Sequence, residues 1–550
     1  MKTLRERCSK RLEGLKSIRK DYETDWRETA RLAQPARSRF LASDKDKNLR
    51  RARNANLFDE HGLLAARTLS NGMTSGLSSQ SRPWFQLATY DDALIDQPDV
   101  KGWLDDVEKR LYSFFASTNF YGASKTGYLE LGLFGTEACV MVEHDEVGAV
   151  CHALTAGEYW IATSSSLTAD TLYRRVPMSV RQAVDTFGKA VAPRVMKMYD
   201  SAQYDETVNV FHAIEPRVER DGSRIDARNK PWASVWWDED DSNCHNVLRE
   251  GGFDEKPFWA PRWDTTGSDT YGYSPGMEAL PSLRELQMQT KRRNETIDKI
   301  VKPELVSPAG MRVTGQPGNI ITSSSVDAGS VQPVYVPAYQ ILPAISEEIG
   351  RCKEAIDRLF YADLFMAITN MQGIQPRNME EIASRNEEKL TQLGPVIERV
   401  NTEKLEVAID RAFGIMQRKG LLPPPPEALA GTDLKINFVS ILTQMQRMVG
   451  IGQIERTAGF VGNLAGVFPE AVDKINVDEM IDEYAERAGA PARLIRSTDE
   501  VAQIRAQRAQ QQAAQQAAAN APAIRDGAEA ARLLSETDTG NGSLLEALAG

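Results

Sequence analysis

The chain has few cysteines, no long apolar run and no apolar segment near its N-terminus. Its 550 residues include five cysteines, an odd and widely scattered set, so we expect reduced thiols of an intracellular protein rather than a disulfide framework. No run of roughly eighteen consecutive apolar residues is present, so no segment is predicted to span a membrane. The basic N-terminus has no apolar core and therefore does not have the pattern of a signal peptide.

The motifs of common enzyme classes are also missing. The chain has no Gly-x-x-x-x-Gly-Lys-Ser/Thr loop for phosphates, no Gly-x-Gly-x-x-Gly, no His-Glu-x-x-His and no Gly-x-Ser-x-Gly. Cys151-His152 and Cys244-His245 are adjacent pairs, which lack the Cys-x-x-Cys spacing that lets two thiolates bind one zinc ion. We therefore predict that the protein is not an enzyme and has no catalytic, cofactor-binding or metal-binding residues.

Three other clusters each allow a functional and a structural interpretation. The run Asp238-Glu239-Asp240-Asp241 could bind a divalent cation, although a charged hairpin tip is the favoured interpretation. The tryptophans within residues 232–263 could stack on bases, although core packing next to prolines is favoured. The basic residues of segment 36–55 could bind nucleic acid, but a solvated basic surface is the more common explanation.

The charge of the chain is negative and unevenly distributed. The net charge is −11, and the contents of 41% hydrophobic and 26% charged residues are ordinary for a soluble globular protein. Residues 1–60 hold 17 Lys and Arg against 10 Asp and Glu, a net +7, so the remainder carries −18. An acidic body does not suit tight wrapping of DNA, which relies on cations, but it suits a surface that DNA passes without adhering. A chain of this length is expected to form roughly three or four substructures.

The most informative stretch lies between residues 280 and 377. Two apolar stripes with the spacing of packed helices flank a segment rich in proline and glycine. The stripes are Leu280, Leu283, Leu286, Ile297 and Val301, and then Ile345, Ile349, Cys352, Ile356 and Leu359. Pro303 and Pro343 bracket the insert, because proline prevents the simple continuation of a helix. The pattern suggests a two-helix stalk carrying a strand-bearing tip, although on spacing alone an ordinary helical hairpin with a long loop is the simpler interpretation.

The rest of the chain predicts a mainly helical α+β protein. Strands are expected at 138–142, 208–214 and 232–237, and helices at 1–33, 59–73, 100–115, 128–133 and 180–187, with a helix break at 72–77. Asn378 and Glu381 have the spacing of a capping box for a helix that runs to about residue 419, in which Pro395 should produce a kink. Residues 436–500 again show helical spacing, and the last fifty residues are of low complexity.

Several phrases of the sequence resemble one family. Gly72-Met73-Thr74-Ser75-Gly76-Leu77 followed by Arg82-Pro83-Trp84-Phe85 resembles the N-terminal signature of the head-to-tail connector (portal) proteins of short-tailed, T7-like bacteriophages. Similar phrases follow in the same order, namely Tyr271-Gly272-Tyr273-Ser274-Pro275-Gly276, Lys302-Pro303, Leu393-Gly394-Pro395-Val396 and Gly420-Leu421-Leu422-Pro423. The segment Arg377-Asn378-Met379-Glu380-Glu381 departs from the Met-Thr-Ala-Thr-Glu common in relatives, and no phrase beyond residue 430 can be assigned.

The resemblance implies a portal-type fold with distinct parts. These parts are a wing at 1–279, stem helices at 280–302 and 344–364, a small α/β clip at 303–343, a tunnel loop at 365–378, a long kinked helix returning to the wing at 379–430, a helical crown at 431–500, and a tail at 501–550 that is a helical barrel or disordered. A clip between two stem helices is consistent with the stalk and tip inferred from the spacing alone. Neighbouring tips in a ring would cover the strand edges that a single tip exposes.

The resemblance also implies a function and a location. Portal proteins form a twelve-subunit ring at one capsid vertex, through which double-stranded DNA enters during packaging and leaves at ejection, without sequence-specific binding. The implied partners are further copies of the chain, the large terminase subunit, tail adaptor proteins, and the major capsid and scaffolding proteins, in a virion assembled in the host cytoplasm. Another ring-forming tail or adaptor protein, or a DNA-packaging enzyme, is the alternative.

Candidate site residues fall in three of these parts. In the tunnel loop they are Met366, Asn370, Met371, Gln372, Gln375 and Arg377. In the stem they are Lys291, Arg292, Arg293, Glu347, Arg351 and Glu354. In the clip, which would contact the motor and later the tail adaptor, they are Glu304, Arg312, Gln316, Asn319 and Tyr335. The three stem cations at 291–293 could face DNA or pair with carboxylates of an adjacent subunit, and pairing is favoured because unpaired cations would retain phosphates.

The predicted tunnel loop is polar and, except for Arg377, uncharged. That composition suits a constriction that touches DNA without binding it. We expect Arg377→Ala to change DNA packaging or retention but not ring assembly, because a single loop cation can attract phosphates without holding subunits together. Packaging assays together with negative-stain micrographs of the variant would check this. Failure of the variant to form rings would contradict it.

Overall fold

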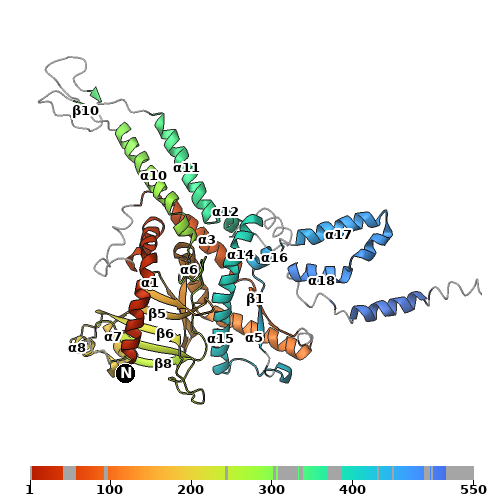
Figure 1. Cartoon of the computed structure of the whole chain (residues 1–550), viewed down its shortest axis with the longest axis horizontal. Helices are drawn as coiled ribbons and strands as arrows, with labels where there is room; N and C mark the ends of the chain where they lie inside the picture. The colour runs from red at the N-terminus through yellow and green to blue at the C-terminus, as the bar shows by residue number, and fades with distance from the viewer. Residues whose placement is uncertain are drawn as a thin grey trace, which may run out of the picture. The chain divides into compact units, whose positions relative to one another are not determined.

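The computed structural model describes residues 3–40, 57–91, 94, 97–241, 246–301, 305–306, 332–333, 339–369, 387–429, 431, 433–448, 451–488, 496, 500–513 and 515. The chain divides into two compact units, Met1–Val449 and Gly450–Gly550, which are described separately below. The predicted mixture of helix and sheet is confirmed, since the first unit contains several antiparallel sheets surrounded by helices (Figure 1).

A five-stranded sheet forms one part of the first unit. Its strands are β4 (Tyr159–Thr163), β5 (Ala169–Ser179), β6 (Thr207–Pro216), β7 (Trp232–Asp238) and β8 (Arg249–Phe253). Each strand pairs antiparallel with the next one along the chain, so the sheet is a simple meander. The strands predicted at 208–214 and 232–237 are confirmed as β6 and β7.

Helix α1 (Leu4–Ala33) packs along one face of this sheet (Figure 1). Thr3 caps the helix, because its side chain accepts a hydrogen bond from the Glu6 N–H and the Glu6 carboxylate accepts one from the Thr3 N–H. The apolar side of α1 meets aromatic side chains of the sheet in a small core of Cys8, Leu12, Leu15, Trp160, Tyr173, Phe211, Ala213, Val235 and Trp237. The predicted N-terminal helix is therefore confirmed.

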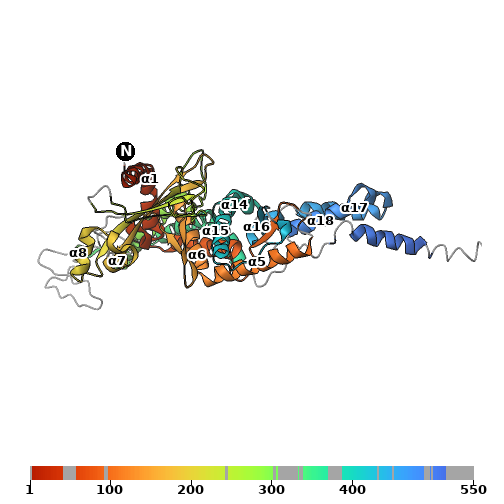
Figure 2. The same ribbon diagram turned by 90° about the horizontal axis from the view of Figure 1, so that it is seen from below.

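Two short helices, α7 (Val180–Phe187) and α8 (Pro193–Asp200), lie at one end of the same sheet (Figures 1 and 2). Ser179 caps α7 in a capping box with Gln182. The two helices share a separate core cluster with Val208 and Val210 of β6. The helix predicted at 180–187 is confirmed.

A second, three-stranded sheet lies in the main core. It consists of β2 (Ala138–His144), β3 (Gly148–Leu154) and the two-residue β9 (Phe258–Trp259), in the order β3-β2-β9. Helix α6 (Phe120–Phe134) packs on it, and the side chains of Trp259 and of Val140 in β2 are completely buried. The strand predicted at 138–142 is confirmed, and α6 includes the predicted helical segment 128–133.

The edge of the main core holds a two-stranded sheet that was not predicted from the sequence. Strand β1 (Phe85–Thr89) precedes α5 (Pro98–Ser117), which corresponds to the helix predicted at 100–115. Strand β1 pairs antiparallel with β12 (Leu434–Phe438), so the helical spacing predicted from residue 436 onward is wrong for residues 436–438. The alternation of apolar and polar residues in β12 is the signal that was missed.

A long helical segment crosses the core between residues 387 and 418. It consists of α14 (Glu387–Val400), a π-helical turn η4 (Asn401–Glu406) and α15 (Val407–Arg418). Helix α14 continues through Pro395, where a kink was predicted. A departure from α geometry comes in the π turn, where the buried stripe Leu390, Leu393, Ile397 and Val400 continues to Leu405, Ala408, Ala412 and Ile415 with one step of five. The predicted capping residues Asn378 and Glu381 lie outside the described residues.

A buried ion pair fixes the π turn to the three-stranded sheet. Lys404 Nζ lies 2.8 Å from Glu137 Oε2, and both side chains are almost completely buried. Trp259 Nε1 donates a hydrogen bond to Glu137 Oε1 at 3.0 Å, and the ammonium lies 3.6 Å from the centre of the Tyr128 ring. Burial raises the pKa of Glu137 and lowers the pKa of Lys404, while the charge of each partner opposes these shifts. The charged form of each side chain is therefore favoured in the core by the opposite charge of its partner.

The second unit is a small helical structure. It contains α17 (Ile451–Ala465), a 3-10 turn η6 (Pro469–Lys474) and α18 (Val477–Ala488), and residues 500–513 are also helical. Arg505 forms a bidentate ion pair with Asp478 of α18, with both N···O distances at 2.6 Å. The helical spacing predicted for this region agrees with these elements.

We expect Lys404→Met to lower the free energy of unfolding by about 3–5 kcal/mol, because it leaves the Glu137 carboxylate buried without a cation. The double variant Lys404→Met with Glu137→Gln should recover most of this loss, since the amide can still accept the hydrogen bond from Trp259. Urea unfolding of the two variants and the parent chain measures both effects. An equal loss in the single and double variants would contradict the assignment.

Candidate functional site at the base of the paired helices

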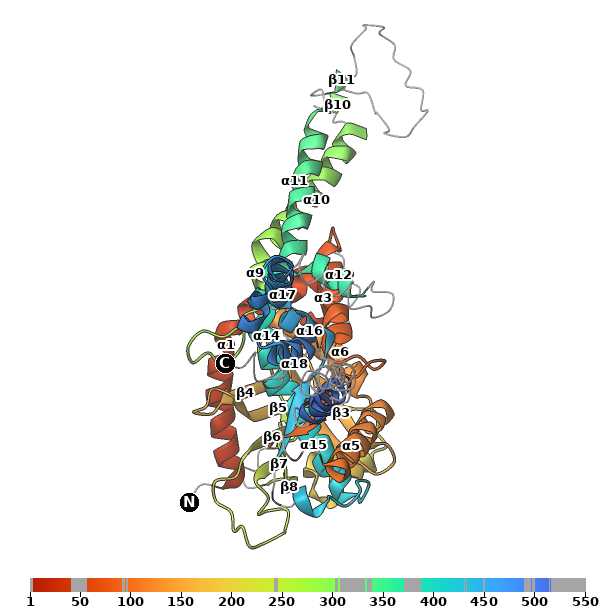
Figure 3. The ribbon, with the colours of Figure 1, turned by 90° about the vertical axis from the view of Figure 1, so that its right-hand side faces the viewer.

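Helices α10 (Leu280–Val301) and α11 (Ile341–Leu359) run side by side (Figures 1 and 3). At about 1.5 Å per residue they are roughly 33 and 28 Å long. Their predicted apolar stripes are confirmed near the rest of the unit, where Leu283, Leu286 and Ile356 are completely buried. Farther along the pair the apolar residues become exposed, with Ile297 at 40%, Val301 at 68% and Ile341 at 51%.

The ends of the second helix differ from the predicted bounds 344–364. Helix α11 begins at Ile341, so Pro343 lies in its first turn, where the missing N–H would have no partner in the helix. The helix ends at Leu359, earlier than predicted. Pro343 therefore starts a helix rather than closing the insert.

A sharp turn separates α11 from the next helix. Tyr361 has a φ of 54°, a left-handed conformation that costs on the order of 1–2 kcal/mol for a residue with a Cβ atom. Phe360 is completely buried beside it, and α12 (Ala362–Thr369) follows. Residues 365–369, which were predicted to begin the tunnel loop, are therefore helical.

Helix α3 (His61–Leu77) passes without interruption through residues 72–77, so the helix break predicted there is wrong. Local sequence favoured a break because glycine is a poor helix former. The glycines instead lie where other helices approach α3 too closely to leave room for a side chain. Gly72 and Gly76 belong to the signature phrase quoted above, and Gly62 is the second residue of the helix.

Three helices from distant parts of the chain use these glycines. The contacts are Gly62 with Leu283 of α10, Gly72 with Phe365 of α12, and Gly76 with Leu442 of α16 (Ile441–Met448). A Cβ atom would lie 2.5 Å from Leu283 Cδ2 at Gly62 and 2.7 Å from Leu442 Cγ at Gly76, and at Gly72 it would overlap the Phe365 ring. Helix α3 is therefore the base on which the paired helices and α12 are positioned.

Asp59 connects α3 with both of the paired helices. Its carboxylate accepts a hydrogen bond from the His61 N–H at 2.8 Å and forms an ion pair with Lys353 of α11 at 2.9 Å. The Gln287 side chain of α10 accepts hydrogen bonds from the N–H groups of Phe58 (2.7 Å) and Asp59 (3.1 Å), and donates one to the Asp59 carbonyl at 2.7 Å. From the sequence, Asp59 was predicted only to start a helix. Its contacts with Gln287 and Lys353 were not predicted, because residues so distant in the chain leave no pattern in the local sequence.

The predicted stem cations of α10 lie on its outer half. Lys291 forms an ion pair with Glu295 of the same helix at 3.8 Å, and Arg292 is exposed. The Nε atom of Arg293 is buried without a hydrogen-bond partner among the described residues. Whether these residues face DNA or an adjacent subunit therefore remains a prediction.

The predicted stem residues of α11 are exposed. Arg351 forms ion pairs within its own helix, with Glu347 at 3.2 Å and Glu348 at 3.3 Å. Glu354 lines a cavity of about 500 Å³ between α11, α12 and α14, together with charged side chains of both signs. Helices α10 and α11 therefore pair much of their own charge among the described residues.

The remaining predicted site residues fall mostly outside the described residues. In the tunnel loop, Met366 is exposed on α12, and the others are not described, namely Asn370, Met371, Gln372, Gln375 and Arg377. All five clip residues are also not described, namely Glu304, Arg312, Gln316, Asn319 and Tyr335. Within the insert, β10 (Leu305–Val306) pairs antiparallel with β11 (Gln332–Pro333).

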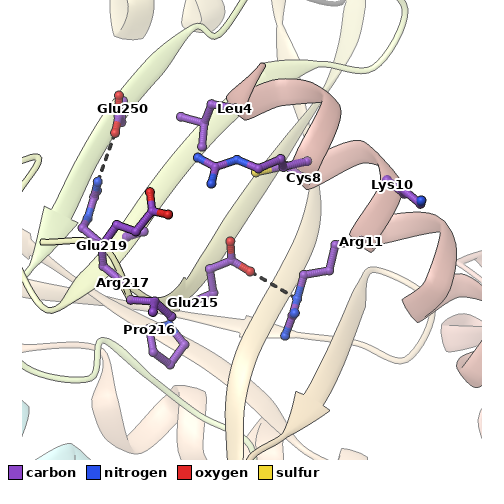
Figure 4. A pocket seen from close by; sticks show the side chains of 12 residues that line it. Leu4, Cys8, Lys10, Arg11, Glu215, Pro216, Arg217, Glu219 and Glu250 are labelled. Carbon is purple, nitrogen blue, oxygen red and sulfur yellow. Dashed lines mark hydrogen bonds and ion pairs between the residues drawn. The ribbon is translucent and has the colours of Figure 1, made fainter. Parts of the chain in front are cut away.

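A cavity of about 920 Å³ lies between the start of α1 and strands β6 to β8 (Figure 4). Two ion pairs lie among its lining residues, with Arg11 3.2 Å from Glu215 and Arg217 3.1 Å from Glu250. Burial, with a smaller effect of Glu215, raises the pKa of the Cys8 thiol to about 11, so this thiol stays protonated near neutral pH and is a poor nucleophile.

Two of the other clusters noted in the sequence, the acidic run and the tryptophans, have structural partners, whereas most of the basic segment 36–55 lies outside the described residues. Asp238 pairs with Arg194 at 2.6 Å and Asp241 with Arg5 at 3.5 Å, so the acidic run forms a charged turn. Trp237, Trp259 and Trp263 are buried in the cores, as the favoured interpretation predicted. Within the described ranges, no group of three or more His, Cys, Asp or Glu could hold a metal ion, and no helix is long and apolar enough to cross a membrane.

We expect Gly72→Ala to destabilise the protein by about 1–3 kcal/mol, because the added methyl group must displace the Phe365 ring. Gly102→Ala is the matched control, since Gly102 also lies within a helix but a Cβ there would contact nothing within 4 Å. This control should be neutral or stabilising by up to about 1 kcal/mol. Thermal unfolding compares the two variants, and an equal effect on both would exclude a special role for Gly72.

Comparisons with known proteins agree with the family that the sequence resembles. Residues 5–495 match the family described as "Bacteriophage head to tail connecting protein". The "Portal protein" of Salmonella phage epsilon15 is 39% identical over 557 aligned residues, which cover 100% of this chain and 98% of the relative. The "Probable portal protein" of Bordetella phage BPP-1 is 37% identical over 533 aligned residues, which cover 96% of this chain and 94% of the relative.

Likeness to solved structures is weak by comparison. A chain from the neck of an empty GTA particle matches 79% of this chain and 90% of its own length, at 11% identity and a TM-score of 0.34. This value is too low to carry an argument. The family match and the curated relatives each extend over most of the sequence, and they confirm the predicted resemblance. The chain belongs to the family of bacteriophage head to tail connecting proteins, the portal proteins.

Proposed function

We propose that twelve copies of this chain form a ring at one vertex of a phage capsid, with a central channel for double-stranded DNA. DNA would enter through the channel during packaging and leave through it at ejection. Residues 1–279 would form the wing, α10 and α11 the stem, the insert between these two helices the clip, and residues beyond about 430 the crown. The ring would be assembled in the host cytoplasm and would remain in the virion between capsid and tail.

The observation that carries this proposal is the uneven burial of the paired helices. Their base is fixed to α3 through Gly62 and Asp59, and its apolar residues are buried within one chain. Farther out, Ile297, Val301 and Ile341 are exposed. A helix pair that leaves large apolar side chains in water favours a further partner. Neighbouring copies of the same pair, arranged around an axis, would cover these side chains.

The protein would guide DNA passively and would not be an enzyme. The sequence contains no phosphate-binding loop, so the energy for translocation would come from a separate ATPase. Twelve copies at −11 each would carry about −132 before counterions, and an acidic surface repels phosphates at short range. The ion pairs of Lys291 and Arg351 within their own helices would further limit binding of the DNA backbone.

The insert at residues 303–343 would be the docking site for other proteins. Its strands β10 and β11 lie at the far end of α10 and α11 from α3 (Figure 3), where a motor or an adaptor could reach them. The partners we propose there are the large terminase subunit during packaging and tail adaptor proteins afterwards. Major capsid and scaffolding proteins would contact the wing.

Electron micrographs of the purified full-length protein test the proposal. We expect rings with a central hole as wide as duplex DNA, and their loss in the double variant Ile297→Asp with Val301→Asp, because burying two unpaired carboxylates between subunits costs several kcal/mol. The control Val218→Asp with Ile225→Asp changes apolar residues that are 94% and 95% exposed in the loop after β6, and it should still form rings. A parent chain that stays monomeric under all assembly conditions would overturn the proposal.

A further inference from the structure

A cavity of about 380 Å³ lies beside the π turn η4. Its apolar lining includes Ile397 of α14 and Phe438 of β12. Its polar lining consists of Glu398, Asn401, Thr402 and Glu406. Turns with π geometry are rare and occur frequently at functional sites. The cavity is therefore a candidate ligand site, outside the paired helices and the insert between them.

Asn401 is the most unusual residue of this lining. It is 8% exposed, and its Oδ1 atom is buried without a hydrogen-bond partner among the described residues. An unpaired buried acceptor is unfavourable, and native structures contain few of them. Asn401 therefore indicates that a hydrogen-bond donor is missing from the cavity.

The other polar groups of the described lining also accept hydrogen bonds. The carboxylates of Glu398 and Glu406 are acceptors in their ionised form. The Thr402 hydroxyl donates its hydrogen to the Glu398 carbonyl at 3.0 Å, so its oxygen can only accept a further hydrogen bond. A ligand of this cavity must therefore supply donors.

Positive charge is also missing from the described lining. The cations nearest to it along the chain already have partners, since Arg399 pairs with Asp264 at 3.4 Å and Lys404 pairs with Glu137 at 2.8 Å. Burial raises the pKa of Glu406, and a nearby carboxylate raises it further. Both effects disfavour the ionised carboxylate, and a cation in the cavity would offset them.

A single metal ion does not fit this lining. In the described part of the chain, no group of three or more His, Cys, Asp or Glu could hold one. Glu398 and Glu406 are eight residues apart on one helical segment, which separates them by on the order of 10–12 Å along its axis. A ligand that meets both carboxylates must therefore carry two cations at separate positions. Ile397 and Phe438 offer apolar contacts to the chain that joins these cations.

We propose that the cavity binds a linear aliphatic triamine such as spermidine, with its end ammonium groups on Glu398 and Glu406. Ammonium groups carry donors and no acceptor, which complements the lining. Extended spermidine spans on the order of 11 Å between its end nitrogens, because nine single bonds of about 1.5 Å join them in a zigzag. Its inner nitrogen lies about 5 Å from one end, and Asn401 lies three residues, or about 4.5 Å, beyond Glu398. A lysine side chain of another protein has one ammonium and would leave the second carboxylate unpaired.

Calorimetric titration of the full-length protein tests the role of the two carboxylates. The probe 1,8-diaminooctane has the span of spermidine without the inner nitrogen, and octylamine has the same stem with one ammonium. In about 0.15 M salt, which screens exposed charges, diaminooctane should bind at least about tenfold more tightly, because each ammonium pairs with its own carboxylate. Equal affinity for the two amines would overturn the proposal. The measurement needs no ring, so this outcome would leave the proposed function intact.

Two double variants locate the site. Glu398→Gln with Glu406→Gln should abolish the preference for diaminooctane, because neither amide carries a charge. The matched control, Glu146→Gln with Glu206→Gln, removes two exposed carboxylates from loops of the same unit and should retain the preference. An equal loss in both double variants would mean a general attraction of amines to an acidic protein, and it would overturn the proposal.

Asn401→Leu separates ligand binding from packing. It should weaken spermidine binding by roughly tenfold, because the inner ammonium loses its acceptor, and should change diaminooctane binding by less than about twofold. The melting temperature of the ligand-free variant should equal that of the parent chain or exceed it, since the substitution removes an unpaired buried polar atom. A lower melting temperature with unchanged spermidine affinity would make Asn401 a purely structural residue and would overturn its place in the site.

Discussion

The arrangement of the first unit depends on how closely three helices approach α3. Helices α10, α12 and α16 each place a bulky side chain against a glycine of α3, at Gly62, Gly72 and Gly76. A glycine inside a helix is less favourable than alanine by up to about 1 kcal/mol, so local preference alone would not select these residues. Close packing of Leu283, Phe365 and Leu442 against the backbone compensates, because each buries a large apolar surface. Helix α3 thereby positions α10, α12 and α16, which lie far apart from one another in the chain.

Buried charge gives the segment formed by α14, η4 and α15 a unique position over the sheets. Lys404 pairs with Glu137, and seven residues later Arg411 contacts both Glu255 (2.6 Å) and Glu143 (3.1 Å). A buried ion pair adds little net stability compared with apolar side chains of the same size, but separating its partners is strongly unfavourable. Sliding the helix by one residue would leave these charges buried without partners. The ion pairs therefore select one register, and the apolar stripe supplies most of the stability.

Local patterns predicted the elements of this protein better than its contacts. The stripes of α10 and α11 could be found because helical spacing is a property of neighbouring residues, and the capped helices α1 and α7 follow the same rule. The break expected at residues 72–77 was wrong because the reason for its glycines, Phe365 and Leu442, lies hundreds of residues away. Alternation in Leu434, Ile436 and Phe438 and the step of five after Val400 were readable signals that went unused. The role of Asp59 had no local signal, and most predicted tunnel-loop and clip residues lie outside the described part of the chain.

The π turn at Asn401–Glu406 rotates the side chains of α15 about the helix axis relative to those of α14. One surplus residue turns every later side chain by about 100° relative to an uninterrupted α-helix. This offset lets α14 face α16 while α15 faces α5, β2 and β9. A relative that lacked this residue would keep a continuous helix, yet its counterparts of Arg411 and Arg418 would point away from the carboxylates they now meet. Insertions and deletions at this turn should therefore be far rarer among relatives than substitutions, although the turn looks like ordinary helix in the sequence.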